Sequence, residues 1–184
     1  MATAYISFSA EIVPHTTEAL IAVMANQVQQ KVETVYLMLS TPGGQVMYGM
    51  TLYNTLRAMP FKLITHNVGN VDSIGNAIFL AGDKRFACPH STFMFHGVGF
   101  DMKPGVRLEE KSAREYLDSI LQDQARIGNI IRDHTSLDEG QVGELFREAR
   151  TKDASYAKEV GIVHEICDVN IPPGDPIISL VFKR

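Results

Sequence analysis

The fold can be predicted outward from one stretch of the sequence, Val35-Tyr-Leu-Met-Leu-Ser-Thr-Pro-Gly-Gly44. Its first five residues form a short apolar run, which is typical of a strand covered on both faces of a sheet. The Pro-Gly-Gly turn ends this strand, and a helical pattern follows over residues 47–59. Before the strand, apolar residues at helical spacing predict another helix over residues 17–30.

The same alternation of strands and helices continues on both sides of this stretch. Helical spacing predicts a further helix over residues 74–81. Short apolar runs predict strands over residues 5–8, 61–66, 92–98, 162–166 and 177–182. Such alternation favours right-handed crossovers and a largely parallel sheet, so the predicted fold class is α/β.

A long helix is predicted over residues 109–134, with apolar residues on roughly one face and charges on the other. At about 1.5 Å per residue it would extend for about 38 Å, so we expect part of it to project and pack on another subunit. Ser136-Leu-Asp-Glu139 is a capping-box pattern that predicts the start of the next helix. Asp153 is the predicted cap of a last short helix that ends at Gly161.

Composition limits the classes of protein that fit. A chain of 184 residues with 45% hydrophobic and 21% charged residues is typical of one globular domain, here residues 1–184. The net charge of -4 argues against nucleic acid as a partner. No apolar run reaches the roughly 20 residues that span a membrane, and Met1–Ile6 shows no signal peptide. Cys88 and Cys167 lack disulfide or metal spacing, so we expect reduced thiols in a cytoplasmic protein without a metal site.

Three segments could carry chemistry, although each also has a structural interpretation. In Gly69-Asn-Val-Asp-Ser73-Ile-Gly75, the serine lies between a strand and a helix, where the amide of Ile74 could stabilise an oxyanion; alternatively, Ser73 is a helix cap. Pro42-Gly43-Gly44 could bring backbone amides close to a ligand, or could simply be a turn. His96 ends the apolar strand that begins at Thr92, and it could be a base or a structural histidine.

Taken together and in this order, the three segments resemble the Clp protease proteolytic subunit family. That family has Ser-Pro-Gly-Gly, Ala-Ser-Met-Gly and a strand ending in Met-Ile-His. The corresponding segments here are Ser40-Thr-Pro-Gly-Gly44, Asp72-Ser-Ile-Gly75 and Phe93-Met-Phe-His96. The resemblance extends from Tyr5 to about Asp168 and includes Ala157-Lys-Glu-Val-Gly161.

The resemblance implies a crotonase-like fold, with a repeated ββα core and a protruding handle helix at about 109–134. It also implies a serine endopeptidase that hydrolyses unfolded polypeptides inside an oligomeric chamber, without a cofactor, as a heptameric ring or two stacked rings. By position, Ser73 would be the nucleophile and His96 the general base, with the N–H groups of Gly44 and Ile74 as the oxyanion hole. The segment from Gly97 to Gly99 would be the strand edge that pairs with an extended substrate.

The sequence departs from the family at the third member of the catalytic triad. The position of the family's acid is taken by Ala149. Glu148, Glu144 and Asp153 lie nearby and are possible substitute acids. Losing the acid lowers turnover by about 10⁴-fold in well-studied triads, so a dyad of Ser73 and His96 would be slow without being inert.

Two other departures concern the ends of the recognisable pattern and the residue before the nucleophile. Tyr5 lies almost at the start of the family's first core strand, which makes a partnership with an ATP-driven unfoldase doubtful. Asp72 replaces a small residue, and we expect it to be solvated or hydrogen bonded. Two alternatives remain at this point, namely a catalytically weak or inactive structural subunit of a ring and crotonase-type chemistry on an acyl-CoA thioester.

Overall fold

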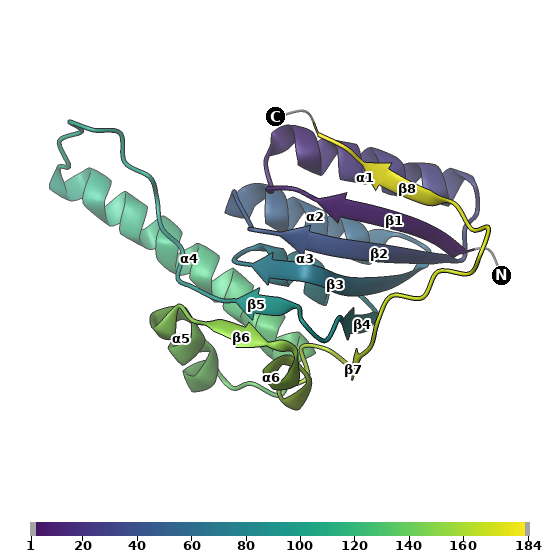
Figure 1. Ribbon diagram of the computed structural model, residues 1–184. Coiled ribbons are helices and arrows are strands. Elements are labelled where there is room, and N and C mark those ends of the chain that lie inside the picture. The colour runs from purple at the N-terminus through teal and green to yellow at the C-terminus, as the bar shows by residue number, and fades with distance from the viewer. Residues whose placement is uncertain (1–2, 183–184) are drawn as a thin grey trace.

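The computed structural model describes residues 3–182, in which a twisted sheet is backed by helices and one long helix extends away from it (Figure 1). The strands are β1 Thr3–Ser9, β2 Thr34–Thr41, β3 Lys62–Asp72, β4 Lys84–Ala87, β5 Thr92–Met94, β6 Thr151–Asp153, β7 Glu165–Ile166 and β8 Ile177–Leu180. The helices are α1 Pro14–Gln29, α2 Val46–Ala58, α3 Gly75–Leu80, α4 Glu110–His134, α5 Glu139–Glu148 and α6 Ala154–Glu159. Met1 and Ala2, which belong to the segment predicted not to be a signal peptide, lie outside the described residues.

The sheet is parallel except at one edge, as the alternation of elements predicted. Its main strand order is β6-β5-β3-β2-β1-β8, and β4 joins β3 to β7. Among the strand pairs within residues 3–182, only that of β5 and β6 is antiparallel. Helices α1, α2 and α3 pack on one another behind the strands, and α4 contacts α3 (Figure 1).

The apolar run at Val35–Leu39 lies in a central strand, β2. Val35, Leu37 and Leu39 share one face of the sheet and are fully buried. On the other face Met38 is buried but Tyr36 and Ser40 are only half-buried, so the cover predicted for both faces is complete on one face alone.

The neighbouring strand β3 is unusually long, and its two halves have different partners. Residues 64–67 pair with β4, whereas residues 70–72 pair with β5. The end of β3 and the end of β5 are therefore brought side by side.

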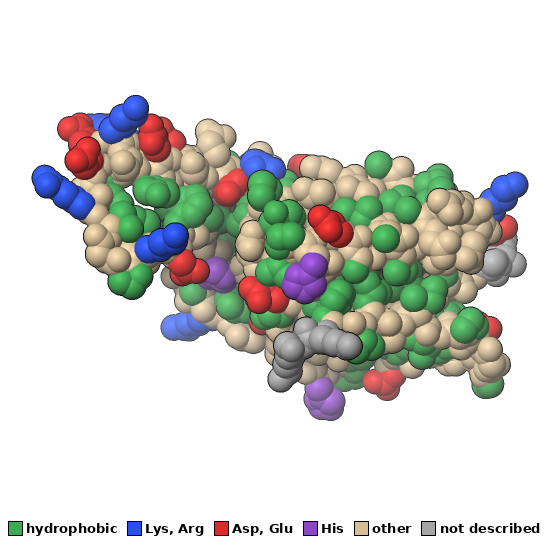
Figure 2. Space-filling model, turned by 90° about the horizontal axis from the view of Figure 1, so that it is seen from above, with side chains coloured by type: hydrophobic (Ala, Val, Ile, Leu, Met, Phe, Trp, Pro, Cys, Tyr) green, Lys and Arg blue, Asp and Glu red, His purple; other side chains and the backbone are tan. Residues whose placement is uncertain are grey.

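Helix α4 confirms the predicted long helix within one residue, and its two halves have different surroundings. Ile127, Ile130 and Ile131 in the second half are buried in the body of the molecule. Leu117 and Leu121 in the first half are more than 50% exposed. Figure 2 shows this projecting end with acidic and basic side chains around hydrophobic ones.

Several details of the predicted elements were wrong. Strands β4 and β6 were not predicted. The predicted strand over 92–98 ends at Met94, and the amides of Gly97 and Val98 are bonded to helices α5 and α4 instead of to a strand. The capping box of α5 uses Asp138 and Gln141 rather than Ser136 and Glu139. The Asp138 carboxylate accepts from the Gln141 amide at 2.8 Å, whereas the Ser136 hydroxyl donates to the Val160 carbonyl.

Asp153 caps α6 as predicted, with its carboxylate accepting from the Tyr156 amide at 2.8 Å. Cys88 and Cys167 are both free and half-buried. Within residues 3–182 there is no helix that is long and apolar enough to cross a membrane. In the same range, no three His, Cys, Asp or Glu side chains are grouped in a way that could hold a metal ion.

Candidate active site

Ser73 occupies a sharp turn between the end of β3 and the start of α3. Its φ of 57° lies in the left-handed region, which a serine adopts only when its surroundings impose it. The Ser73 amide donates to the Met94 carbonyl at 2.8 Å, which ties the turn to β5. The buried Asn76 side chain donates to the carbonyls of both Ser73 and Met94, at 3.0 and 2.8 Å. These bonds fix the serine and leave its side chain half-buried.

The turn at Gly43 and Gly44 lies directly against this serine. A Cβ added to Gly43 would lie 2.6 Å from the Ser73 Cβ and 2.7 Å from the Asp72 carbonyl oxygen, and its φ is 88°. The turn is joined to Ile12, whose amide donates to the Gly43 carbonyl at 2.7 Å. A glycine is therefore required at position 43 on two grounds, the positive φ and the close approach.

Two backbone amides beside the serine have no acceptor. Among the residues that the structure describes, neither the Gly44 amide nor the Ile74 amide donates a hydrogen bond. Both residues line the same small cavity as Ser73. Unpaired amides of this kind can stabilise negative charge on an oxygen atom, which is the role that the family resemblance implies for these two positions.

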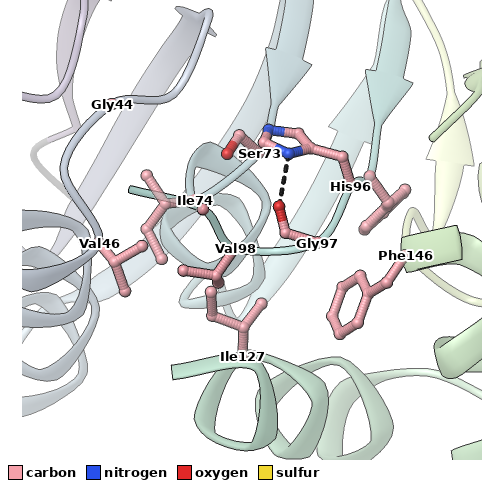
Figure 3. A pocket seen from close by; sticks show the side chains of 11 residues that line it. Gly44, Val46, Ser73, Ile74, His96, Gly97, Val98, Ile127 and Phe146 are labelled. Atoms are coloured by element: carbon pink, nitrogen blue, oxygen red, sulfur yellow. Dashed lines mark hydrogen bonds between the residues drawn. The ribbon is translucent and has the colours of Figure 1, made fainter. Parts of the chain in front are cut away.

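His96 comes two residues after the end of β5 and lines the same cavity as Ser73. The preceding residue, Phe95, is buried and anchors the chain, whereas the imidazole is exposed. Its Nδ1 lies 2.7 Å from the Gly97 carbonyl oxygen, and since a carbonyl can only accept, Nδ1 carries the proton. Figure 3 shows this bond, with the second ring nitrogen on the side of Ser73. The described structure contains no direct hydrogen bond between Ser73 and His96.

The cavity that the serine and histidine share is about 70 Å³ in volume and is lined by both polar and apolar groups. Its apolar side chains come from five different segments, namely Val46, Ile74, Phe95 with Val98, Ile127 and Phe146. A wider groove of about 630 Å³ adjoins it, sharing Gly44, Val46, Val98 and Gly99 as lining residues. Figure 3 shows Ser73 and His96 beside the small cavity.

The segment from Gly97 to Gly99 pairs with no strand of the described residues, and its pairing with a substrate stays a prediction. The Gly97 amide donates to the Phe146 carbonyl at 3.2 Å, and the Val98 amide donates to the Gln124 side chain at 3.1 Å. These two amides are thus bound internally. Around Gly99, by contrast, there is open space.

None of the candidate acids forms a hydrogen bond or ion pair with His96. Ala149 ends α5 with a left-handed φ of 48°. Glu148 binds Lys152 at 2.8 Å, and this hydrogen bond lowers the pKa of the Glu148 carboxyl. Glu144 pairs with Arg147 at 2.8 Å, and Asp153 caps α6. The three carboxylates are therefore occupied by other partners.

Asp72 is hydrogen bonded, as we expected from its position. Its carboxylate accepts from the Asn70 side chain at 2.6 Å, and Asn70 also donates to the Thr41 carbonyl. The carboxylate is thereby engaged along the edge of β2 and β3. Nothing in the sequence singled out Asn76 or Gln124, whose roles depend on partners 18 and 26 residues away.

Comparison with known proteins gives one consistent result. A family model described as Clp protease matches residues 1–170. Two curated relatives, each named ATP-dependent Clp protease proteolytic subunit 2, come from Corynebacterium diphtheriae and Corynebacterium efficiens. Each is 28% identical to this chain, over 73% and 72% of its length, and the matches span 66% and 65% of the relatives' own length.

A solved structure of a Clp protease subunit has a similar fold. A ClpP1 mutant from Listeria monocytogenes superposes with a TM-score of 0.77, at 21% identity, over 91% of each chain. This match confirms the predicted α/β fold of the Clp protease type. Since the family model covers nearly the whole chain, this protein belongs to the Clp protease family.

Proposed function

We propose that this protein is a serine endopeptidase in which Ser73 is the nucleophile and His96 the general base. The observation that carries the proposal is the arrangement around one cavity. Ser73 is held in a left-handed turn, two amides without acceptors lie beside it, and a histidine with a free ring nitrogen faces the same cavity. Acyl transfer needs these three parts and no cofactor.

The reaction follows from the protonation state of the histidine. With the proton on Nδ1, Nε2 of His96 is free to take the proton of the Ser73 hydroxyl as its Oγ attacks a peptide carbonyl. The N–H groups of Gly44 and Ile74 then bind the oxyanion of the tetrahedral intermediate. Protonated His96 gives its proton to the leaving amine, and a water molecule releases the acyl group in a second step of the same kind.

The proposed site works as a dyad. Glu148, Glu144 and Asp153 have other partners, so a substitute acid would first have to leave its present partner. By comparison with triads that lose their acid, turnover would be about 10⁴-fold below that of a complete triad. We therefore expect slow hydrolysis, which is best detected with a reagent that marks each active serine once.

The proposed substrate is an extended polypeptide. The cavity beside Ser73 would take one side chain of the substrate, and the adjoining groove would hold the neighbouring residues. Gly99 lines both, and its amide has no hydrogen-bond partner among the described residues, so this is the amide that would pair with the substrate backbone. An unfolded chain meets these requirements, whereas a folded surface would not enter the cavity.

We also propose that the protein works as a homo-oligomer of the ring type. The support is the projecting half of α4, where Tyr116, Leu117 and Leu121 are exposed in a stripe that a second copy could cover. Light scattering of the purified protein would measure the assembly, with seven or fourteen subunits expected.

We also predict that the protein works without an ATP-driven unfoldase. If a mixture of this protein and such an unfoldase degraded a folded substrate when ATP was added, this prediction would be contradicted.

A fluorophosphonate probe tests the catalytic proposal, because it forms a covalent bond only with an activated serine. Wild type should be labelled, whereas Ser73→Ala and His96→Ala should not be. Ser119→Ala, which removes an exposed serine of α4, is the matched control and should be labelled like wild type. Mass spectrometry of the labelled peptide should place the adduct on Ser73.

A second candidate function is a structural subunit that assembles into rings with little catalysis. The observation in its favour is Ala149 at the acid position, with no carboxylate bonded to His96. It predicts a stable oligomer that the probe does not label. The labelling experiment therefore separates the two functions in one measurement.

A further inference from the structure

One peptide group links the proposed catalytic histidine to the long helix. The carbonyl of the Gly97–Val98 peptide accepts from Nδ1 of His96 at 2.7 Å. The N–H of the same peptide donates to the Oε1 atom of Gln124, in α4, at 3.1 Å. The next amide along the chain towards His96, that of Gly97, donates to the Phe146 carbonyl at 3.2 Å. Both ends of the peptide group are thus engaged.

This arrangement controls which nitrogen of His96 acts as the base. The tautomer of a neutral histidine is set by the hydrogen bond that its other nitrogen makes. The Gly97 carbonyl selects the form with the proton on Nδ1, but only while the peptide plane is turned towards the ring. Gln124 fixes that plane, since its Oε1 accepts from the N–H on the opposite side. A hydrogen bond to the N–H also polarises the carbonyl and makes it a better acceptor.

The fit around the peptide is tight on the side of the helix. A Cβ added to Gly97 would lie 2.7 Å from Oε1 of Gln124. The half-buried glutamine therefore packs against the backbone as well as bonding to it. A side chain at position 124 without an oxygen acceptor would release the peptide N–H.

We propose that Gln124 is a positioning residue that acts through the Gly97–Val98 peptide to orient His96. It supplies part of what a triad acid does, namely holding the imidazole and selecting its tautomer, although it adds no negative charge. The inference rests on the proposed function of Ser73 and His96. It extends that function to a residue in α4, a helix whose other half is exposed.

Three variants of α4 test this role. Gln124→Met keeps the volume of the side chain and removes the acceptor, so its rate constant for fluorophosphonate labelling should fall about fivefold to tenfold, the effect of one hydrogen bond. Gln124→Glu keeps an oxygen acceptor at the same place and should label within about twofold of wild type. Gln122→Met, an exposed position on the same helix, is the control and should label like wild type.

Nitrogen-15 NMR of the histidine rings provides a readout that does not depend on catalysis. In wild type, His96 should carry its proton on Nδ1, and in Gln124→Met the fraction of the other tautomer should rise. Equal labelling rates in wild type and Gln124→Met, or a wild-type His96 with its proton on Nε2, would overturn the proposal.

The two proposals fail in different ways. If wild type is not labelled, the proposed function is wrong, and the NMR tautomer alone decides the role of Gln124. If Gln124→Met does not fold, the tautomer in wild type and the labelling of Gln124→Glu decide it.

Discussion

Substituting alanine for Gly43 would test the contact on which the proposed oxyanion turn depends. The new Cβ would lie 2.6 Å from the Ser73 Cβ and 2.7 Å from the Asp72 carbonyl oxygen, where real Cβ atoms do not occur. A left-handed φ costs an L-residue about 1–2 kcal/mol, and overpacking of a filled space costs about 1–3 kcal/mol more. We therefore expect Gly43→Ala to lower the free energy of unfolding by about 2–5 kcal/mol.

Gly174→Ala separates the two contributions. Gly174 has a similar φ of 95°, but nothing lies within 4 Å of its added Cβ, so only the conformational cost of about 1–2 kcal/mol should appear. Urea denaturation at one protein concentration would measure both variants, since association contributes to apparent stability. Labelling by the fluorophosphonate probe should be lost in Gly43→Ala and kept in Gly174→Ala. Equal stability of the two variants, with labelling intact in both, would refute the close packing of Gly43 on Ser73.

Three further predictions concern stability. Ser73→Gly should be more stable than Ser73→Ala by about 1 kcal/mol in urea denaturation, because both lack the hydroxyl but only alanine retains a Cβ at a φ of 57°; equal stability would argue against a strained turn. Arg85→Lys should lower the free energy of unfolding by about 3 kcal/mol, since the buried guanidinium donates to four carbonyls that a single ammonium cannot reach, and an unchanged urea midpoint would contradict this. Burial lowers the pKa of His66 below its usual 6.5, so below about pH 6.5 the unfolded chain binds a proton at this residue more readily than the folded chain does. The free energy of unfolding should therefore fall as the pH drops below about 6.5, by at most about 1.4 kcal/mol per pH unit. His66→Gln should make this slope, measured by urea denaturation, less steep.

The parts of the fold that were predicted from sequence are those with strong local patterns. The apolar run at Val35 and the amphipathic spacing of α4 depend on residues close together in the chain. The short strands β4 and β6 were missed, because three or four residues carry no periodicity and form strands only beside a partner. The capping box at Asp138 was placed two residues early, since Ser136-Leu-Asp-Glu139 fits the same pattern and only packing decides between them.

In the candidate site, too, some residues could be predicted from the sequence and others could not. Ser73, His96 and the two glycines could be named because their order along the chain resembles a family. The cap at Asp153 was predicted from its place before a helix, but the pairing of Glu148 with Lys152 and of Glu144 with Arg147 was not, since each depends on a side chain that could have turned elsewhere. Gln124 resembles the other polar residues of a charged helix, and its importance follows only from its contact with Val98 across 26 residues of chain.

The packing at Gly43 also affects what can be inferred about activity from the sequences of related proteins. The Asp72 carbonyl oxygen, a backbone atom, would by itself exclude a Cβ at position 43. A lineage that had lost Ser73, and with it catalysis, would still be unable to accept a larger residue there. A glycine at position 43 would therefore be kept for packing whether or not the serine is active, and its presence in a related sequence is not by itself evidence of a working peptidase.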